Sequence, residues 1–436
     1  MAETTQTVPA SPAPAAGPKG GIIRNFLNAT EVDVRLIGML IALAVIWIGF
    51  NIGSGGLFLS PRNLWNLSVQ TATIAILANG MVLIIVSRNI DLSVGSLLAF
   101  IGIIMSVVQA DILPADTPFL WLIAIVAGLI LGVVLGALQG FVIAYLQVPA
   151  FIVTLAGLLV WRGATYLVTT GRTVAPLDTT YQWFGGGADG TIGPTASWVV
   201  GVIACIGIII SLVSTRRQRQ RFNFPLRPMW AEIFLGVVGC AAVLIAVQVL
   251  NSYDMPINLA KRYAQEHNIA WPANGMLNFS FGISVPVIVA IVAALGLSFI
   301  STRTRFGRYV FAIGGNPEAA TLGGINVRWV IMMTFVVMGV LCAIGGVVAT
   351  ARLNAATAGL GTNYELYTIA ATVIGGTSFA GGIGSISGAM LGALVMQSLQ
   401  SGMELLGIDT PLQNVIIGVV LVVAVGIDTW YRRRAP

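Results

Sequence analysis

Residues 302–328 read TRTRFGRYVFAIGGNPEAATLGGINVR, and this polar stretch stands in a chain of 436 residues that is 57% hydrophobic and 9% charged. Apolar runs long enough to cross a bilayer lie on both sides of it, at 284–301 and at 329–350. The stretch is therefore a connection between two predicted membrane spans, and the other features of the chain are best placed relative to it.

The centre of this connection predicts a short helix. Asn316 is a favourable N-cap, and Pro317 suits the first helical turn because its missing N–H would be unpaired there anyway. Glu318 puts a negative charge near the positive end of the helix dipole. Gly323 and Gly324 end the helix after about two turns. The alternative to a docking helix is that this segment is an ordinary basic loop on the cytoplasmic side.

The composition excludes a soluble globular protein. Soluble domains carry about 25% charged residues, whereas this chain carries 9% and has a mean hydropathy of +0.91. Runs of about 20 apolar residues recur along nearly the whole length, which is typical of membrane-spanning helices. The sequence therefore predicts an all-α polytopic membrane protein.

The apolar runs predict about twelve transmembrane helices, within a range of ten to twelve. Residues 1–33 are predicted to form a disordered cytoplasmic tail, and residues 34–430 a single membrane domain. The predicted spans lie at 34–50, 64–86, 90–109, 119–145, 149–170, 197–213, 231–250, 284–301, 329–350, 365–379, 384–403 and 411–428, the tenth being unusually short.

The distribution of positive charge predicts that both termini are cytoplasmic. With that orientation, sixteen of the 22 Lys and Arg residues fall in inner segments, five in outer segments and one, Arg162, within a span. Such an excess on the cytoplasmic side is expected of membrane proteins. The basic cluster at 214–230 fits this orientation and attraction to anionic lipid, so no nucleic-acid partner is predicted.

The short helix carries the first resemblance to a known family. Glu318-Ala319-Ala320, three residues and then Gly324 resemble the EAA-x-x-x-G motif of importer permeases that are driven by an ATP-binding-cassette subunit. The resemblance implies that 302–328 is a coupling loop whose helix sits in a groove on the ATPase. The residues predicted to make this coupling surface are Asn316, Glu318, Ala319, Ala320, Gly323 and Gly324.

The string NIDLSVGS at 89–96 resembles the most recognisable motif of the ribose- and xylose-type sugar permeases. Asp91 can cap the helix that begins there, with Ser93 in its first turn. If the turn lies deeper in the membrane, Asp91 is a costly buried carboxylate that lines the translocation path together with Ser93 and Gly95. Both interpretations are open on the sequence alone.

The pattern from Pro149 to Arg162 also resembles these permeases. Arg162 lies thirteen residues beyond Pro149, about 20 Å of helix rise, so it falls past mid-membrane. It either faces the path or an outer gate, or it pairs with a carboxylate or a backbone carbonyl. Gln139-Gly140 and the long central segment 197–283 resemble the xylose-type branch.

A glycine-rich stretch, IGGTSFAGGIGS at 374–385, separates two helical segments near the C-terminus. Irregular backbone in a membrane is tolerated only where protein or water covers it. The stretch is therefore predicted either to pack helices closely or to line and gate the path. The residues assigned to the gating interpretation are Gly375, Gly376, Thr377, Gly381 and Gly382, and the small residues that favour close packing are Gly388, Ala389, Gly392 and Ala393.

Other chemistry is not indicated. The chain has no G-x-x-x-x-G-K-[ST] phosphate loop, so ATP and Mg²⁺ are expected on the partner ATPase and no cofactor on this chain. Cys205, Cys240 and Cys342 lie in apolar runs and the chain has one His, so no metal site is predicted. No motif of a catalytic site occurs, and the protein is not predicted to be an enzyme.

The resemblance implies a permease domain at 34–430 that moves a monosaccharide, xylose or a related pentose, across the bacterial inner membrane. It implies a second copy of the chain, a cytosolic ATPase and a periplasmic sugar-binding protein, with lipid around the assembly. Arg172, Arg262 and Arg352 are the candidates for docking the binding protein. The alternatives are a branched-chain amino-acid permease and an ion-coupled secondary transporter, for which only Asp91 is a suitable carboxylate.

Overall fold

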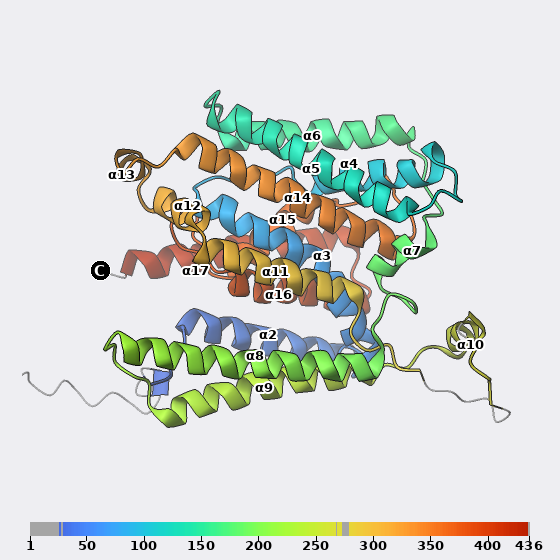
Figure 1. Cartoon of the computed structure of the whole chain (residues 1–436), viewed down its shortest axis with the longest axis horizontal. Coiled ribbons are helices and arrows are strands. Elements are labelled where there is room, and N and C mark those ends of the chain that lie inside the picture. Colours follow the sequence, from blue (N-terminus) through green and yellow to red (C-terminus); the bar gives the residue numbers. More distant parts are fainter. Residues whose placement is uncertain (1–25, 28, 267, 273–278, 435–436) are drawn as a thin grey trace, which may run out of the picture.

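The computed structural model describes residues 26–27, 29–266, 268–272 and 279–434, so most of the predicted tail lies outside the described residues. Apart from isolated β-bridges, the regular structure in these residues is helical, which confirms the all-α class (Figure 1). Nine of the described helices are long and apolar enough to cross a membrane: α2 (Val34–Gly53), α3 (Pro61–Val86), α4 with its π-helical extension (Val94–Ile112), α5 (Leu120–Ala144), α6 (Ala150–Thr169), α8 (Gly193–Arg221), α9 (Met229–Asn251), α11 (Val285–Arg303) and α14 (Val327–Leu353).

The last three predicted spans coincide with α15 (Tyr364–Ile374), α16 (Ile386–Leu405) and α17 (Thr410–Arg434). The 11 residues of α15 rise about 16 Å, about half of a 30 Å hydrocarbon core, so the tenth segment is as short as expected. The described helices thus match the predicted segments in position, and a polytopic membrane fold is confirmed. The number of crossings stays a prediction.

The polar connection holds two helices, although only one was predicted. α13 (Pro317–Leu322) is the predicted helix, and α12 (Arg305–Gly315) precedes it. The hydroxyl of Thr304 accepts the N–H of Gly307 at 3.2 Å and caps α12. Val310 and Ile313 are buried on one side of it. The helix was not predicted, because the several Arg residues of this segment obscured its amphipathic pattern in the sequence.

Three further short helices lie in the segments predicted as outer loops, namely α7 (Thr179–Gln182), the 3₁₀ turn η2 (Trp183–Gly185) and α10 (Ile257–Glu266). Helix α8 also continues to Arg221, through residues that were predicted to be a loop. Arg and Gln are good helix formers, which explains this continuation into the basic cluster.

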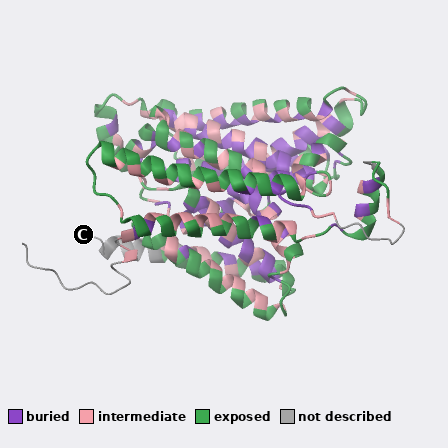
Figure 2. Cartoon of the chain, turned by 60° about the horizontal axis from the view of Figure 1, so that its bottom comes forward, coloured by how far each residue is buried: buried purple, intermediate pink, exposed green. Residues whose placement is uncertain are grey.

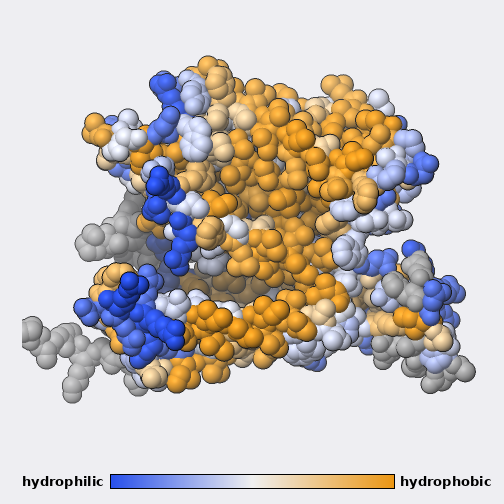
Figure 3. Space-filling model, in the orientation of Figure 1, coloured by the Kyte–Doolittle hydropathy of each residue, from blue (hydrophilic) through white to orange (hydrophobic). Residues whose placement is uncertain are grey.

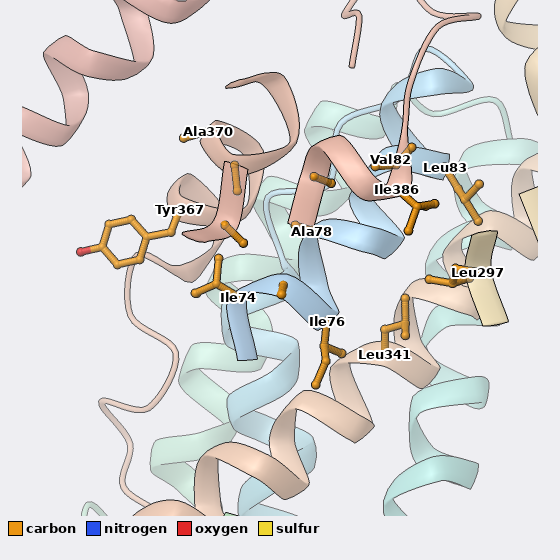
Figure 4. Packing of buried hydrophobic residues seen from close by; sticks show 14 of the residues in the cluster. Ile74, Ile76, Ala78, Val82, Leu83, Leu297, Leu341, Tyr367, Ala370 and Ile386 are labelled. Carbon is orange, nitrogen blue, oxygen red and sulfur yellow. The ribbon is translucent and has the colours of Figure 1, made fainter. Parts of the chain in front are cut away.

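Helix α3 forms the centre of the bundle, and almost all of it is buried. The buried residues gather in the middle of the molecule, whereas α8 and α9 are largely exposed (Figure 2). Four other helices pack around α3 in one buried cluster (Figure 4), which includes Ile74, Ala78 and Val82 of α3, Leu297 of α11, Leu341 of α14, Tyr367 of α15 and Ile386 of α16. The glycine-rich segment and the coupling loop are both anchored to this core.

Helices α5 and α14 approach each other through glycine. A methyl group on Gly132 would overlap the carbonyl oxygen of Gly339, and one on Gly136 would overlap that of Phe335. Glycines four residues apart lie on one face of a helix and allow backbones to come this close. The contact fixes the position of α14, the helix that follows α13 in the chain.

We expect Gly136→Ala to lower the midpoint of thermal unfolding of the detergent-solubilised protein. Overpacking of a tight contact costs about 1–3 kcal/mol. Gly207→Ala on α8 is the matched control, because no atom lies within 4 Å of the added methyl group. Equal midpoints for the two variants would show that the α5–α14 contact does not limit stability.

Hydrophilic residues gather at two opposite ends of the molecule, with a hydrophobic band between them (Figure 3). Helices α12 and α13 and the C-terminal end lie at one end, and α7 and α10 lie at the other (Figure 1). We call these the α13 end and the α10 end. The band has the arrangement expected of a protein that spans a bilayer.

Helices α8 and α9 are tied to the rest of the chain by an ion-pair cluster outside the spans. Arg219 donates to both carboxylate oxygens of Glu31, at 2.8 and 2.6 Å, and Arg227 donates at 3.1 Å. These hydrogen bonds, from Arg219 above all, lower the pKa of Glu31 from 4.5 to about 2. Because the folded pKa is the lower one, the contact is intact at neutral pH and weakens only below about 4.5.

Candidate functional site

Helix α13 has the local structure that the sequence predicts. The Asn316 side chain accepts the N–H of Ala319 at 3.0 Å, and Gly323 donates to the Ala319 carbonyl at 2.9 Å. Glu318 in the first turn is exposed, and Gly324 follows with a φ of +81°, a conformation that suits glycine. The helix thus presents Glu318 at the surface of the α13 end.

The tip of α13 also presents an apolar side chain. Leu322 is 90% exposed, whereas Ala320 on the opposite face is 6% exposed and packs on the core. Leu322 follows Glu318 by four positions, so the two side chains lie on the same face of the helix. Leu322 was not among the predicted coupling residues, because a single exposed leucine cannot be recognised from the sequence.

Helix α12 connects α13 to the end of α3 through Arg88. The Arg88 Nε atom donates to the Gly314 carbonyl and its second guanidinium nitrogen to the Gly315 carbonyl, both at 2.8 Å. These are the last carbonyls of α12, where a cation is favoured by the helix dipole. Arg88 itself has a φ of +64°. The residue immediately after these two carbonyls is Asn316, the N-cap of α13.

The glycine-rich segment meets the same point. Gly382 donates its N–H to the Val86 carbonyl of α3 at 3.0 Å. A Cβ on Gly381 would lie 2.5 Å from Cγ of Arg88 and 2.7 Å from the Gly314 carbonyl oxygen. The end of α3, the end of α12 and the 375–385 turn are therefore in direct contact, next to α13. Gly381 and Gly382 are required as glycines by this close approach.

A groove of about 760 Å³ opens beside α13. It lies between the turn that joins α5 to α6, the first turns of α14 and the Thr321 side of α13. Its polar lining comes from Asn89, Gln147, Thr321, Asn326 and Arg328. The groove enlarges the surface that the α13 end offers to a partner.

Asp91 is fully buried, but it does not cap a helix as one interpretation expected. Helix α4 begins at Val94, with Ser93 as its N-cap. One Asp91 oxygen accepts the N–H and the hydroxyl of Ser93, at 2.8 and 2.6 Å, in a local turn. The other oxygen is buried without a hydrogen-bond partner among the described residues. The helix starts four residues later than predicted, because Asp91 to Ser93 form this turn instead of the first helical turn.

Ser93 and Gly95 lie in a packed polar centre. The Gln139 amide donates to the Ser93 hydroxyl at 2.9 Å. A methyl group on Gly95 would overlap the Gly361 carbonyl oxygen and would lie 2.5 Å from a carboxylate oxygen of Glu365. The predicted residues Asp91, Ser93 and Gly95 are therefore brought together with the segment before α15.

Arg162 donates to the carbonyls of Ala358 and Leu360, at 2.9 and 2.7 Å. The contact with backbone carbonyls was one of the two predicted arrangements. It holds the irregular segment 354–363 between α14 and α15, whose carbonyls need partners at membrane depth. Whether Arg162 also borders the path stays a prediction.

The turn between α15 and α16 combines close packing with irregular backbone. A methyl group on Gly388 would overlap the Gly375 carbonyl oxygen, and one on Gly392 would overlap that of Ala371, so the predicted close packing is confirmed. Gly376, like Gly381 and Gly382, has a positive φ. The Thr377 hydroxyl is buried and makes no hydrogen bond with the described residues.

The three docking candidates lie on separate elements. Arg172 follows α6 and forms an ion pair with Asp111, Arg262 lies on α10, and Arg352 is exposed in the last turn of α14. Arg352 also lines a second cavity of about 250 Å³. Their role in docking stays a prediction.

Comparisons with known proteins agree with the motifs. The family model described as the branched-chain amino acid transport system permease component matches residues 63–425. The chain is 39% identical over 410 residues to the xylose transport system permease protein XylH of Haemophilus influenzae, covering 93% of this chain and 98% of the relative. It is 34% identical over 415 residues to XylH of Escherichia coli K12, covering 94% and 95%.

The ribose import permease protein RbsC of Escherichia coli K12 is 30% identical over 414 residues, covering 93% of this chain and 96% of the relative. No solved structure matches the chain. The matches extend over the coupling loop, the 89–96 motif and the glycine-rich turn. The chain therefore belongs to the ribose- and xylose-type permeases of sugar importers, multi-pass proteins of the bacterial inner membrane.

Proposed function

We propose that the chain is the membrane subunit of an ATP-driven importer that carries xylose or a related pentose into the cell. The observation that carries this proposal is the 39% identity to a xylose permease across 98% of that relative. Two copies of the chain would form the membrane unit, with twelve crossings each and both termini in the cytoplasm. ATP and Mg²⁺ would bind to a separate cytosolic ATPase, and a periplasmic binding protein would deliver the sugar.

In this proposal the α13 end faces the cytoplasm and α13 docks on the ATPase through Glu318, Ala319 and the exposed Leu322. Asn316, Gly323 and Gly324 shape the helix, and Ala320 anchors it to the core. Movement of α13 would pass through Gly314 and Gly315 to Arg88 and the glycine-rich turn, because these groups are in direct contact. Arg172, Arg262 and Arg352 at the α10 end would meet the binding protein.

Residues around two breaks in the helices would form the path. Asp91, Ser93 and Gly95 lie at the first break and Arg162 holds the irregular segment 354–363 near it. Gly375, Gly376, Thr377, Gly381 and Gly382 form the second break, where three glycines have positive φ angles and the buried Thr377 hydroxyl has no hydrogen-bond partner among the described residues. Breaks of this kind are where membrane transporters place their moving parts.

The test is uptake of labelled xylose, ribose, galactose, arabinose and leucine. Cells that retain the cognate ATPase and binding protein are compared with and without this gene. Loss of xylose uptake alone, restored by the gene, is the expected result. Loss of leucine uptake instead would favour a branched-chain amino-acid permease, the alternative that the description of the matching family model supports.

A further inference from the structure

The second cavity lies between the α10 end and the middle of the bundle. Helix α14 rises about 40 Å from α13 to its last turn, so Arg352 and Leu353 stand near the α10 end. Thr73, on the opposite wall, lies near the middle of α3. The remaining lining comes largely from the irregular segment 354–363 and Tyr364, the first residue of α15. The cavity is thus framed by a broken pair of helices.

Hydrogen-bonding groups in this cavity lack partners in the protein. The guanidinium of Arg352 and the hydroxyls of Thr73, Thr357 and Tyr364 make no hydrogen bond with any residue that the structure describes. Thr73 is 2% exposed, so this unpaired hydroxyl is not simply at the protein surface. Buried polar groups are normally paired, and a buried unpaired hydroxyl in the wall of a cavity that other polar residues also line suits a polar ligand.

The size and charge of the cavity define the ligand class. A volume of about 250 Å³ is far more than a single water needs, and it has room for one sugar ring. The lining contains hydroxyls, one guanidinium and one aromatic ring, but no Asp or Glu. A sugar can use all of these groups, whereas the ammonium group of an amino acid would find no carboxylate among them.

We infer that this cavity is a low-affinity monosaccharide site of the permease, reached by the sugar from the α10 end. The inference rests on the proposed sugar import and names the residues that first hold the substrate. Arg352, Thr73 and Thr357 donate hydrogen bonds to sugar hydroxyls, and the Tyr364 ring packs against the C–H groups of the sugar. Thr362 supports the wall, because its hydroxyl donates to the Gly359 carbonyl at 2.7 Å.

Protection of a cysteine from a small water-soluble methanethiosulfonate reagent tests this site. Thr357→Cys is made in the complete complex, after replacement of Cys205, Cys240 and Cys342. Xylose at about four times its Kd is expected to slow the modification about fivefold, because only the unoccupied site reacts. Equal concentrations of leucine are expected to have no effect. Thr173→Cys, exposed at the same end, is the control and reacts at one rate throughout.

Three results would overturn the site. The first is a Thr357→Cys rate that no transported sugar changes, and the second is no reaction of Thr357→Cys at all while Thr173→Cys reacts. The third is equal slowing of both cysteines, which would indicate a general change of conformation. A Tyr364→Ala substitution is expected to abolish protection, and Tyr364→Phe to retain it, since the ring makes the contact.

Uptake by the same variants separates this inference from the proposed function. If Thr357→Cys transports xylose but shows no protection, the site is wrong and the importer function stands. If the complex transports leucine and leucine protects the cysteine, the proposed sugar import fails as well.

Discussion

The Glu318→Arg variant is expected to reach the membrane in normal amount and to lose sugar uptake. Glu318 is exposed and lies in the first turn of a six-residue helix, so no packed contact is lost on substitution. Charge reversal would instead remove the complementary contact that we propose with the ATPase, and would place a cation at the positive end of the helix dipole. The measurements are membrane abundance, co-purification of the ATPase and uptake of labelled xylose.

Asp116→Arg is the matched control, because it reverses an exposed acidic residue in the segment between the α4 extension and α5. It should leave both uptake and co-purification unchanged. Full uptake by the Glu318→Arg variant would remove α13 from the coupling surface, whatever the chain transports.

The Arg88→Ala variant is expected to assemble with the ATPase but to lose coupling. It removes both 2.8 Å hydrogen bonds to the end of α12 without altering the surface of α13. We expect ATP hydrolysis to persist without stimulation by the loaded binding protein, and uptake to fall about tenfold or more, which corresponds to at least about 1.4 kcal/mol. Arg88→Lys should restore part of the uptake, since lysine keeps the charge but not the forked geometry.

Arg62→Ala, an exposed arginine at the other end of α3, is the control for loss of charge. The combination of lost stimulation and retained assembly is what distinguishes a coupling role from a structural one. Normal stimulation in Arg88→Ala would show that force does not pass from α13 through this contact.

The sequence predicted what local chemistry determines. The Asn316 cap, the first-turn Glu318 and the glycine stop of α13 involve residues a few positions apart, and all three were confirmed. The positions of the apolar helices and the close packing of Gly388 and Gly392 followed from composition and spacing alone. The family followed from short motifs, which the comparisons support.

Contacts between distant segments could not be predicted in this way. Arg88 counted only as one cytoplasmic charge, since its partners lie 226 and 227 positions away in the chain. The partners of Arg162 are backbone carbonyls, which every residue carries and no motif distinguishes. Asp91 was expected as a possible helix cap. The turn in which Asp91 accepts the N–H of Ser93 uses the same residue types as a helix cap, so the sequence cannot distinguish the two.

Energy coupling is the most direct test of the account. Uptake of labelled xylose is measured in cells that express the chain, with the cognate ATPase present, with the ATPase gene deleted, and with a protonophore at constant cellular ATP. The account predicts that uptake disappears with the ATPase and persists in the protonophore. Uptake that survives loss of the ATPase and collapses with the protonophore would contradict it and identify an ion-coupled transporter.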